Sequence, residues 1–525
     1  MNYADLFRVT LPETALEIAA LLVLVVDLGL LRKAALKVRV AIAALLGVAG
    51  CAAALWALSA QDGIWLTYGD SGFPVLGSGG FIAVAQSGIL VLTALTLLLL
   101  MDSVFTLHVG EYVAVVLMAA TGGLVVAGAQ DLLVIFVGLE LLSLGLYILT
   151  AFAKSSAKSA EAAMKYYLFG GMSAAFLLFG FSYLYGLSGT TSLAGIRQAI
   201  TESGPSPMFY VAWILVVAGL GFKVAAVPFH LWAPDTYEGA PAPAAAFIAS
   251  VSKVASFAPL ITLSMNWLMM GGQISGNPSS INGYLRQYYA TWPKLAVILL
   301  ILAAASMIVG NLAALAQASV RRLLAYSAIA HAGYILLGIA THASFYGQGS
   351  ALHFFASTIR PTMVSTNAVL FYILTYGLTT IGAFGVVDVV QRATGSDRFD
   401  AFLGLHKRNP VLAAVLLVLF LSLAGIPPLV GFWAKFNLFA AVLGTSAGVV
   451  PFALVALAVA FSAVSLYYYL QVLKRAYVMA AVDPTPIKAH PVTLAVLVLI
   501  ASAVVVLGCF PNLLQGWIEG LSPVL

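Results

Sequence analysis

The chain consists almost entirely of apolar segments that are each long enough to cross a lipid bilayer. A membrane-spanning helix needs about 20 apolar residues. Of the 525 residues, 62% are hydrophobic and 8% are charged, whereas a soluble domain carries about 25% charged residues. The sequence therefore predicts an all-α polytopic membrane protein with about fourteen spans, at 12–31, 38–60, 80–101, 109–128, 130–152, 160–188, 208–228, 240–270, 292–316, 320–341, 365–392, 410–446, 450–475 and 491–509.

The positions of the basic residues predict how these spans are oriented. Connections that follow odd-numbered spans hold fifteen lysines and arginines, and the opposite side holds five. Because cytoplasmic loops are enriched in Lys and Arg, both termini are expected on the non-cytoplasmic side. The longest polar connections are short, so residues 1–525 are expected to form one integral domain, with 510–525 along the membrane surface; these connections are 61–79, 189–207, 271–291 and 342–364.

Two predicted spans are interrupted by proline. The seventh runs into Pro228, and the twelfth contains Pro427 and Pro428; proline lacks the backbone donor that a helix needs. Paired broken helices indicate inverted repeats in transporters, although two prolines could also fall at matching places by chance. We therefore predict two oppositely oriented five-helix blocks, spans 4–8 and spans 9–13. The expected division is three N-terminal helices, a first repeat, a second repeat, and a C-terminal helix and tail, at 1–108, 109–270, 292–475 and 491–525.

Five ionisable side chains lie inside these apolar spans. They are Glu140, Lys165, Lys223, Lys253 and Lys435. A charge at bilayer depth is costly and usually faces a partner or a water-filled path. Five such groups indicate a protein that moves charge, and the proton is the simplest charge to move through titratable side chains.

Three of these groups are predicted to lie deep in the membrane. Glu140 follows Asp131 by nine residues, roughly 13 Å along a helix, so we expect it to pair with a lysine, either in a relay or as a structural ion pair. Lys223 precedes the Pro228 break, where freed carbonyls can accept hydrogen bonds. Lys253 has small polar neighbours and no acid in its own span, so its partner must come from another helix.

The remaining candidates are less constrained. Lys435 follows the second break and is expected to occupy the position equivalent to Lys223, as a relay site or as a lysine held by carbonyls. Lys165 lies near a cytoplasmic helix end, where a relay role and simple snorkelling to the interface both remain open. His331, among small neighbours, would either bridge the two halves of a relay or be merely hydrogen-bonded.

Other functional classes have no support in the sequence. The two cysteines, Cys51 and Cys509, form no CxxC motif, and there is no HExxH, GxGxxG or GxxxxGK[ST] pattern. No basic run typical of nucleic-acid binding occurs. We therefore expect no cofactor, no metal and no nucleic acid on this chain.

Five stretches resemble the proton-translocating, antiporter-like membrane subunits of complex I. The stretches are ELLSLGLYIL, AAMKYYLFGG, GLGFKVAAVPFHLWAPDTYEGAPAP, RRLLAYSAIAHAGYILLG and GIPPLVGFWAKF. Of the three subunit types, lysine at 435 resembles L and N, because M-type chains carry glutamate there. The chain also ends soon after the fourteenth span, without the long lateral helix of L, so the resemblance favours the N type.

The resemblance implies roles for the buried groups and for partners. Glu140 and Lys223 would form the ion pair of a first half-channel, Lys253 would be the central lysine, Lys435 would belong to the second half-channel, and His331 would match a histidine on the tenth span. NADH, flavin, iron–sulfur clusters and quinone would reside in partner subunits, and neighbours would include a second antiporter-like subunit, a small helical subunit and lipids of a bacterial inner membrane. A Mrp-type cation/proton antiporter and a non-pumping membrane scaffold remain alternatives.

Overall fold

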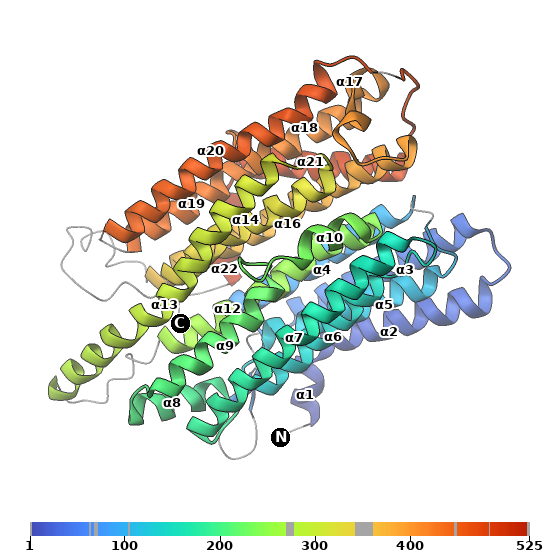
Figure 1. Ribbon diagram of the computed structural model, residues 1–525. Coiled ribbons are helices and arrows are strands. Elements are labelled where there is room, and N and C mark those ends of the chain that lie inside the picture. The colour runs from blue at the N-terminus through green and yellow to red at the C-terminus, as the bar shows by residue number, and fades with distance from the viewer. Residues whose placement is uncertain are drawn as a thin grey trace.

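The protein is an elongated bundle of helices that run roughly side by side, with α2 to α7 on one flank and α18 to α20 on the other (Figure 1). The computed structural model describes residues 3–61, 63, 65–67, 72–102, 105–268, 278–341, 361–445, 449–481 and 483–521. Within these residues, eleven helices are long and apolar enough to cross a membrane, and three shorter apolar helices lie beside them. The chain is an integral membrane protein.

The N-terminal part consists of three long helices joined by a small hairpin. Asp27, at the end of the first, accepts two hydrogen bonds from Arg39, both at 2.7 Å, and one from the Gly110 backbone N–H. These contacts join the end of α2 to α3 and to α5 (Val109–Gly128). The elements are α1 (Tyr3–Val9), α2 (Leu11–Val25) with a π-helical turn η1 (Val26–Leu30), α3 (Leu36–Ser59), the antiparallel strands β1 (Trp65–Thr67) and β2 (Pro74–Gly77), and α4 (Gly80–Leu100).

The middle of the chain forms a second group of helices. Asp131 caps α6 by accepting a hydrogen bond from the Leu133 N–H at 2.8 Å. Helices α5 and α6 approach so closely that a Cβ at Gly122 would lie 2.5 Å from the Leu142 nitrogen. The elements are α5 (Val109–Gly128), α6 (Leu132–Thr150), α7 (Ala157–Ser188), α8 (Leu193–Ser203), α9 (Pro207–Lys223), α10 (Trp232–Gly239), α11 (Ala242–Ala249) and α12 (Val251–Leu268).

The C-terminal part also consists of long helices, and its proline-containing span is interrupted between α18 and α19. Helices α14 and α16 are almost entirely buried, whereas α20 exposes most of its surface, which places α14 and α16 in the interior and α20 at the edge. The elements are α13 (Pro278–Leu315), α14 (Val320–Thr341), α16 (Pro361–Thr394), η5 (Phe399–Phe402), α17 (Leu405–Arg408), α18 (Pro410–Ala424), α19 (Val430–Thr445), α20 (Val449–Tyr477), α21 (Pro491–Cys509) and α22 (Asn512–Leu521).

The structure differs from the expected boundaries in several places. Helix α9 ends at Lys223, five residues before the proline, because the chain has already left helical geometry at Ala225, whose φ is 57°. The span predicted at 240–270 is interrupted at Ser250. The predicted connection at 189–207 contains α8, and that at 61–79 contains the hairpin, so the chain is not wholly helical.

Two predicted connections fall partly on residues that the structure does not describe. The connection at 271–291 lies outside the described residues up to 277, and α13 begins at Pro278; the connection at 342–364 lies outside them up to 360. Near the C-terminus, α22 exposes Leu513 and Trp517 and buries Ile518; the position of 510–525 along the membrane surface stays a prediction.

Candidate functional site

Glu140 and Lys223 form an ion pair inside the bundle. The Lys223 ammonium lies 3.4 Å from Glu140 Oε1 and donates a 2.5 Å hydrogen bond to Ser143 Oγ. The Lys223 side chain is 5% exposed and that of Glu140 is 26% exposed. Glu140 and Ser143 are three residues apart on α6, so both face the end of α9 where Lys223 lies. The predicted carboxylate–lysine pair is therefore present in the structure.

The first helix break provides the binding partner of Lys253. The carbonyl of Val224, the residue after Lys223, accepts a hydrogen bond from the Lys253 ammonium. The last carbonyls of a helix have no intrahelical partner, so the end of α9 supplies an acceptor in the interior. Lys253 is 2% exposed. The end of α9 therefore involves two buried lysines: Lys223 is its last residue, and Lys253 is bound by the carbonyl of the next residue, Val224.

The second break holds Lys435 in a similar way. Its ammonium donates to the carbonyls of Leu423 and Ala424 at 3.1 and 2.9 Å, and to Ser462 Oγ at 2.7 Å. Both carbonyls belong to the last turn of α18, next to the break. Lys435 is 6% exposed. A helix C-terminus carries partial negative charge and stabilises a cation there.

These contacts correct the expected equivalence of Lys435 and Lys223. Lys223 is the last residue before its break and is bound by a carboxylate, whereas Lys435 lies after its break and reaches back to carbonyls. Lys253 shares the carbonyl binding of Lys435. The two positions differ because Lys223 precedes Pro228 by five residues, whereas Lys435 follows Pro428 by seven.

His331 lies among aromatic side chains between the two lysine sites. Its Nδ1 lies 2.7 Å from the Tyr372 hydroxyl, and its ring contacts those of Tyr334 and Tyr376. The Lys435 ammonium lies 5.7 Å from the centre of the Tyr334 ring. His331 is 4% exposed and is close enough to Lys253 and Lys435 for electrostatic interaction. The contacts of His331 are thus with tyrosines, and its role as a bridge between the two sites stays a prediction.

Lys165 belongs to a different cluster. Its ammonium lies 2.8 Å from Asp235 on α10 and 2.6 Å from Glu161 on its own helix. Asp235 also lies 2.7 Å from an Arg322 guanidinium nitrogen on α14. Lys165 is 41% exposed, and its ion pairs connect it to this outer cluster and not to Glu140 or Lys223.

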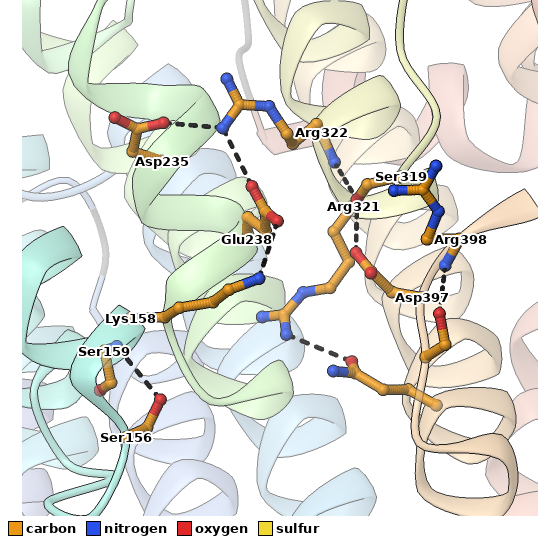
Figure 2. A network of polar contacts seen from close by, with 12 residues as sticks. Ser156, Lys158, Ser159, Asp235, Glu238, Ser319, Arg321, Arg322, Asp397 and Arg398 are labelled. Atoms are coloured by element: carbon orange, nitrogen blue, oxygen red, sulfur yellow. Dashed lines mark hydrogen bonds and ion pairs between the residues drawn. The ribbon is translucent and has the colours of Figure 1, made fainter.

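The cluster spans the two predicted repeats. The same Arg322 nitrogen lies 2.9 Å from Glu238, which in turn lies 3.4 Å from Lys158 on α7 (Figure 2). The neighbouring Arg321 is buried and donates to the Ala240 carbonyl at the end of α10. The short helix α10 is thus held by α7 on one side and by α14 on the other.

Burial and ion pairing act in opposite directions on Asp235, which lies between the membrane-spanning segments. Burial alone would raise the pKa of its carboxyl, but hydrogen bonds from Lys165 and Arg322 outweigh burial and hold the pKa below its ordinary value. Asp235 is therefore ionised in the cluster.

Sequence reasoning missed several residues of these sites. Ser143 could have been found from its spacing of three residues after Glu140. Asp235 and Glu238 share that same spacing on α10, and Arg321 and Arg322 are adjacent in sequence. No local pattern marks the Val224 carbonyl, Tyr372 or Ser462. Among the described residues, no group of three or more His, Cys, Asp or Glu could hold a metal ion.

The fold is that of a polytopic helical membrane protein with ionisable side chains in its interior. Comparison with known proteins identifies the family. The profile of the family described as NADH:quinone oxidoreductase/Mrp antiporter, transmembrane, matches residues 129–278 and 284–462. The chain belongs to this family.

Individual relatives indicate the subunit type within this family. The chain is 45% identical to NADH-quinone oxidoreductase subunit N 2 of Acidobacterium capsulatum over 99% of both chains. It superposes with a TM-score of 0.73 and 31% identity on a chain of respiratory complex I from Thermus thermophilus with bound aureothin, covering 96% of this chain and 98% of that one. The resemblance to the N type is therefore confirmed.

A chain of the Mrp complex from Dietzia sp. DQ12-45-1b is also similar, with a TM-score of 0.73, 20% identity and coverage of 97% of each chain. That likeness shows the shared fold.

Proposed function

We propose that this chain is a proton-translocating membrane-arm subunit of an NADH-quinone oxidoreductase, in which buried lysines and a glutamate relay protons. The observation that carries the proposal is the row of buried groups around the two helix breaks: Glu140 and Lys223, then Lys253 on the Val224 carbonyl, then His331, then Lys435 on the carbonyls of α18. The names of the relatives and the family support the same assignment.

In this proposal each group has one step in the relay. Separation of Glu140 from Lys223 removes the counter-charge of the lysine and favours loss of its proton. Lys253 is the next acceptor in the relay. Its ammonium is bound by the carbonyl of Val224, the residue that follows Lys223 in the chain. His331 and water would pass the proton to Lys435. The first and second five-helix repeats, 109–270 and 292–475, would each provide one half of the path.

The family and the names of the relatives support a set of proposed partners, and the distribution of lysine and arginine supports the proposed orientation. NADH, flavin, iron–sulfur clusters and quinone would be bound by partner subunits, which carry out the electron transfer that drives the relay. A second antiporter-like subunit and a small helical subunit would flank this chain in the inner membrane of a bacterium, with both termini on the non-cytoplasmic side. Lys165 and its cluster would serve the cytoplasmic face.

The experiment that tests the proposal has two measurements. Purification of the tagged chain in mild detergent should recover flavin and iron–sulfur subunits, and membrane vesicles should take up or release protons when NADH is added. Recovery of the chain without redox partners, together with cation exchange in proteoliposomes, would favour the Mrp-type antiporter. Normal proton pumping after charge-neutral replacement of the buried lysines would favour the remaining alternative, a non-pumping membrane scaffold.

A further inference from the structure

One buried acid lies outside the relay. Glu13, in the first turn of α2, is 5% exposed. Its Oε1 lies 3.5 Å from the Gln86 side-chain nitrogen on α4, and its Oε2 is buried without a hydrogen-bond partner. Its environment is therefore unlike that of Glu140, which has a lysine beside it.

Gln86 does not supply enough hydrogen-bond donors for a charged Glu13 carboxylate. Its amide nitrogen also donates to the Leu124 carbonyl of α5 at 3.1 Å, while its own carbonyl oxygen is buried without a partner. Two buried acceptor oxygens, Glu13 Oε2 and Gln86 Oε1, thus lack donors. A proton on the carboxyl would supply one donor and remove the charge.

No cation compensates Glu13 among the described residues. The salt bridges of that part of the chain do not include it, Glu17 on the same helix adds negative charge, and Arg8 on α1 is exposed. The charged groups of the neighbouring α3 and α5 are Lys37, Arg39 and Glu111. They lie at the Asp27 end, which is fourteen residues or about 20 Å along the helix. An ionised carboxylate buried without a partner costs several kcal/mol.

We propose that Glu13, held between α2, α4 and α5, is a proton-binding site that carries its proton as a neutral carboxylic acid in the resting protein. The site lies one helix away from the relay: Gly88, two residues after Gln86, packs against Val254 beside Lys253, and Gly123, beside Leu124, packs against Ala255. The N-terminal helices would then hold a titratable proton next to the first half of the relay.

The test is carbodiimide labelling of the intact complex in native membranes, mapped by mass spectrometry. Dicyclohexylcarbodiimide reacts with protonated carboxyls in apolar surroundings. At neutral pH we expect at least about tenfold more adduct on Glu13 than on the ion-paired Glu140, a ratio that corresponds to ~1.4 kcal/mol in protonation free energy. The adduct should decrease as the pH rises and be absent in Glu13→Gln.

Infrared spectroscopy of the purified complex decides the case where the reagent fails to reach the site. The carbonyl stretch of a protonated acid should be present in the wild type, absent in Glu13→Gln and retained in Glu140→Gln. Loss of that band and of the adduct when sodium is added would overturn the proposal in favour of a cation site. A wild-type spectrum identical to that of Glu13→Gln, together with no labelling, would also overturn it.

Discussion

Buried lysines in this protein have two kinds of partner. Lys223 is paired with a carboxylate, whereas Lys253 and Lys435 are bound by helix-end carbonyls. A carbonyl solvates an ammonium through its dipole without neutralising the charge. Proton release from Lys253 or Lys435 therefore needs no ion pair to separate, while release from Lys223 depends on the position of Glu140. This difference makes the Glu140–Lys223 pair the natural point of control.

Replacement of Glu140 by glutamine tests that control. Breaking a buried ion pair costs about 3–5 kcal/mol, and ~1.4 kcal/mol in a barrier is already tenfold in rate. Because Glu140 is 26% exposed, the pair is only partly buried and the complex should assemble normally. We expect NADH-driven proton translocation in vesicles to fall by about tenfold or more, because the relay loses the counter-charge of Lys223. The matched control is Glu161→Gln, because Glu161 pairs with the half-exposed Lys165 and exposed pairs contribute little. Equal losses in both variants would contradict the assignment.

Among the helices, both breaks contain a residue with left-handed backbone geometry, but the residue types differ. The first has an alanine in the left-handed region, Ala225 at a φ of 57°, and the second has Gly425 at 89°. A side chain in this region costs about 1–2 kcal/mol. A Cβ at Gly425 would also lie 3.0 Å from the Lys435 side chain, so this glycine leaves room for the lysine.

The reciprocal substitutions should shift stability in opposite directions. Gly425→Ala is expected to destabilise the protein by about 1 kcal/mol or more and to displace Lys435 from its carbonyls. Ala225→Gly relieves the backbone strain and should be neutral or stabilising by up to about 1 kcal/mol. Thermal unfolding of the purified complex measures both. A loss in Ala225→Gly as large as that in Gly425→Ala would show that φ is not the cause.

Sequence reasoning located the long helices well and their interruptions less well. A run of apolar residues such as 320–341 is defined by composition, so it coincides with α14. The end of α9 depends on a tertiary contact, because the Val224 carbonyl released there is bound by Lys253 from another helix. The interruption at Ser250 involves local contacts, among them the Ser250 hydroxyl donating to the Ala246 carbonyl. Proline at 228 marked the first break, but not the residue at which it begins.

At the scale of the whole molecule, the cluster around Asp235 joins the two halves of the chain. Arg322 on α14 lies 87 residues from Asp235 and 84 from Glu238, and α14 also carries His331. Movement of α10 would therefore shift α14, the helix that holds His331, which is the bridge in the proposed relay. Sequence reasoning could identify each charged residue but not this cluster, since nothing local specifies which distant charges will meet.

The pH dependence of stability tests the cluster. Because the pKa of Asp235 is lowered in the folded protein, its stabilising contribution is complete above the unfolded value of about 3.9 and is lost as the pH falls through the folded value. Asp235→Asn should lower the unfolding temperature of the purified complex by a constant amount above about pH 5, and the difference should shrink below about pH 4. The control is Asp400→Asn, which replaces an exposed acid outside the cluster; the same pH pattern in both variants would contradict the role of the cluster.

The most direct test of the relay is the ratio of protons translocated to electrons transferred in vesicles that contain Lys253→Met. Methionine keeps the length and burial of the side chain but removes its charge, while Lys33→Met removes an exposed lysine as the control. The relay predicts that the ratio falls in Lys253→Met while the complex still assembles, and that Lys33→Met matches the wild type. An unchanged ratio in Lys253→Met would contradict the proton path through the two broken helices.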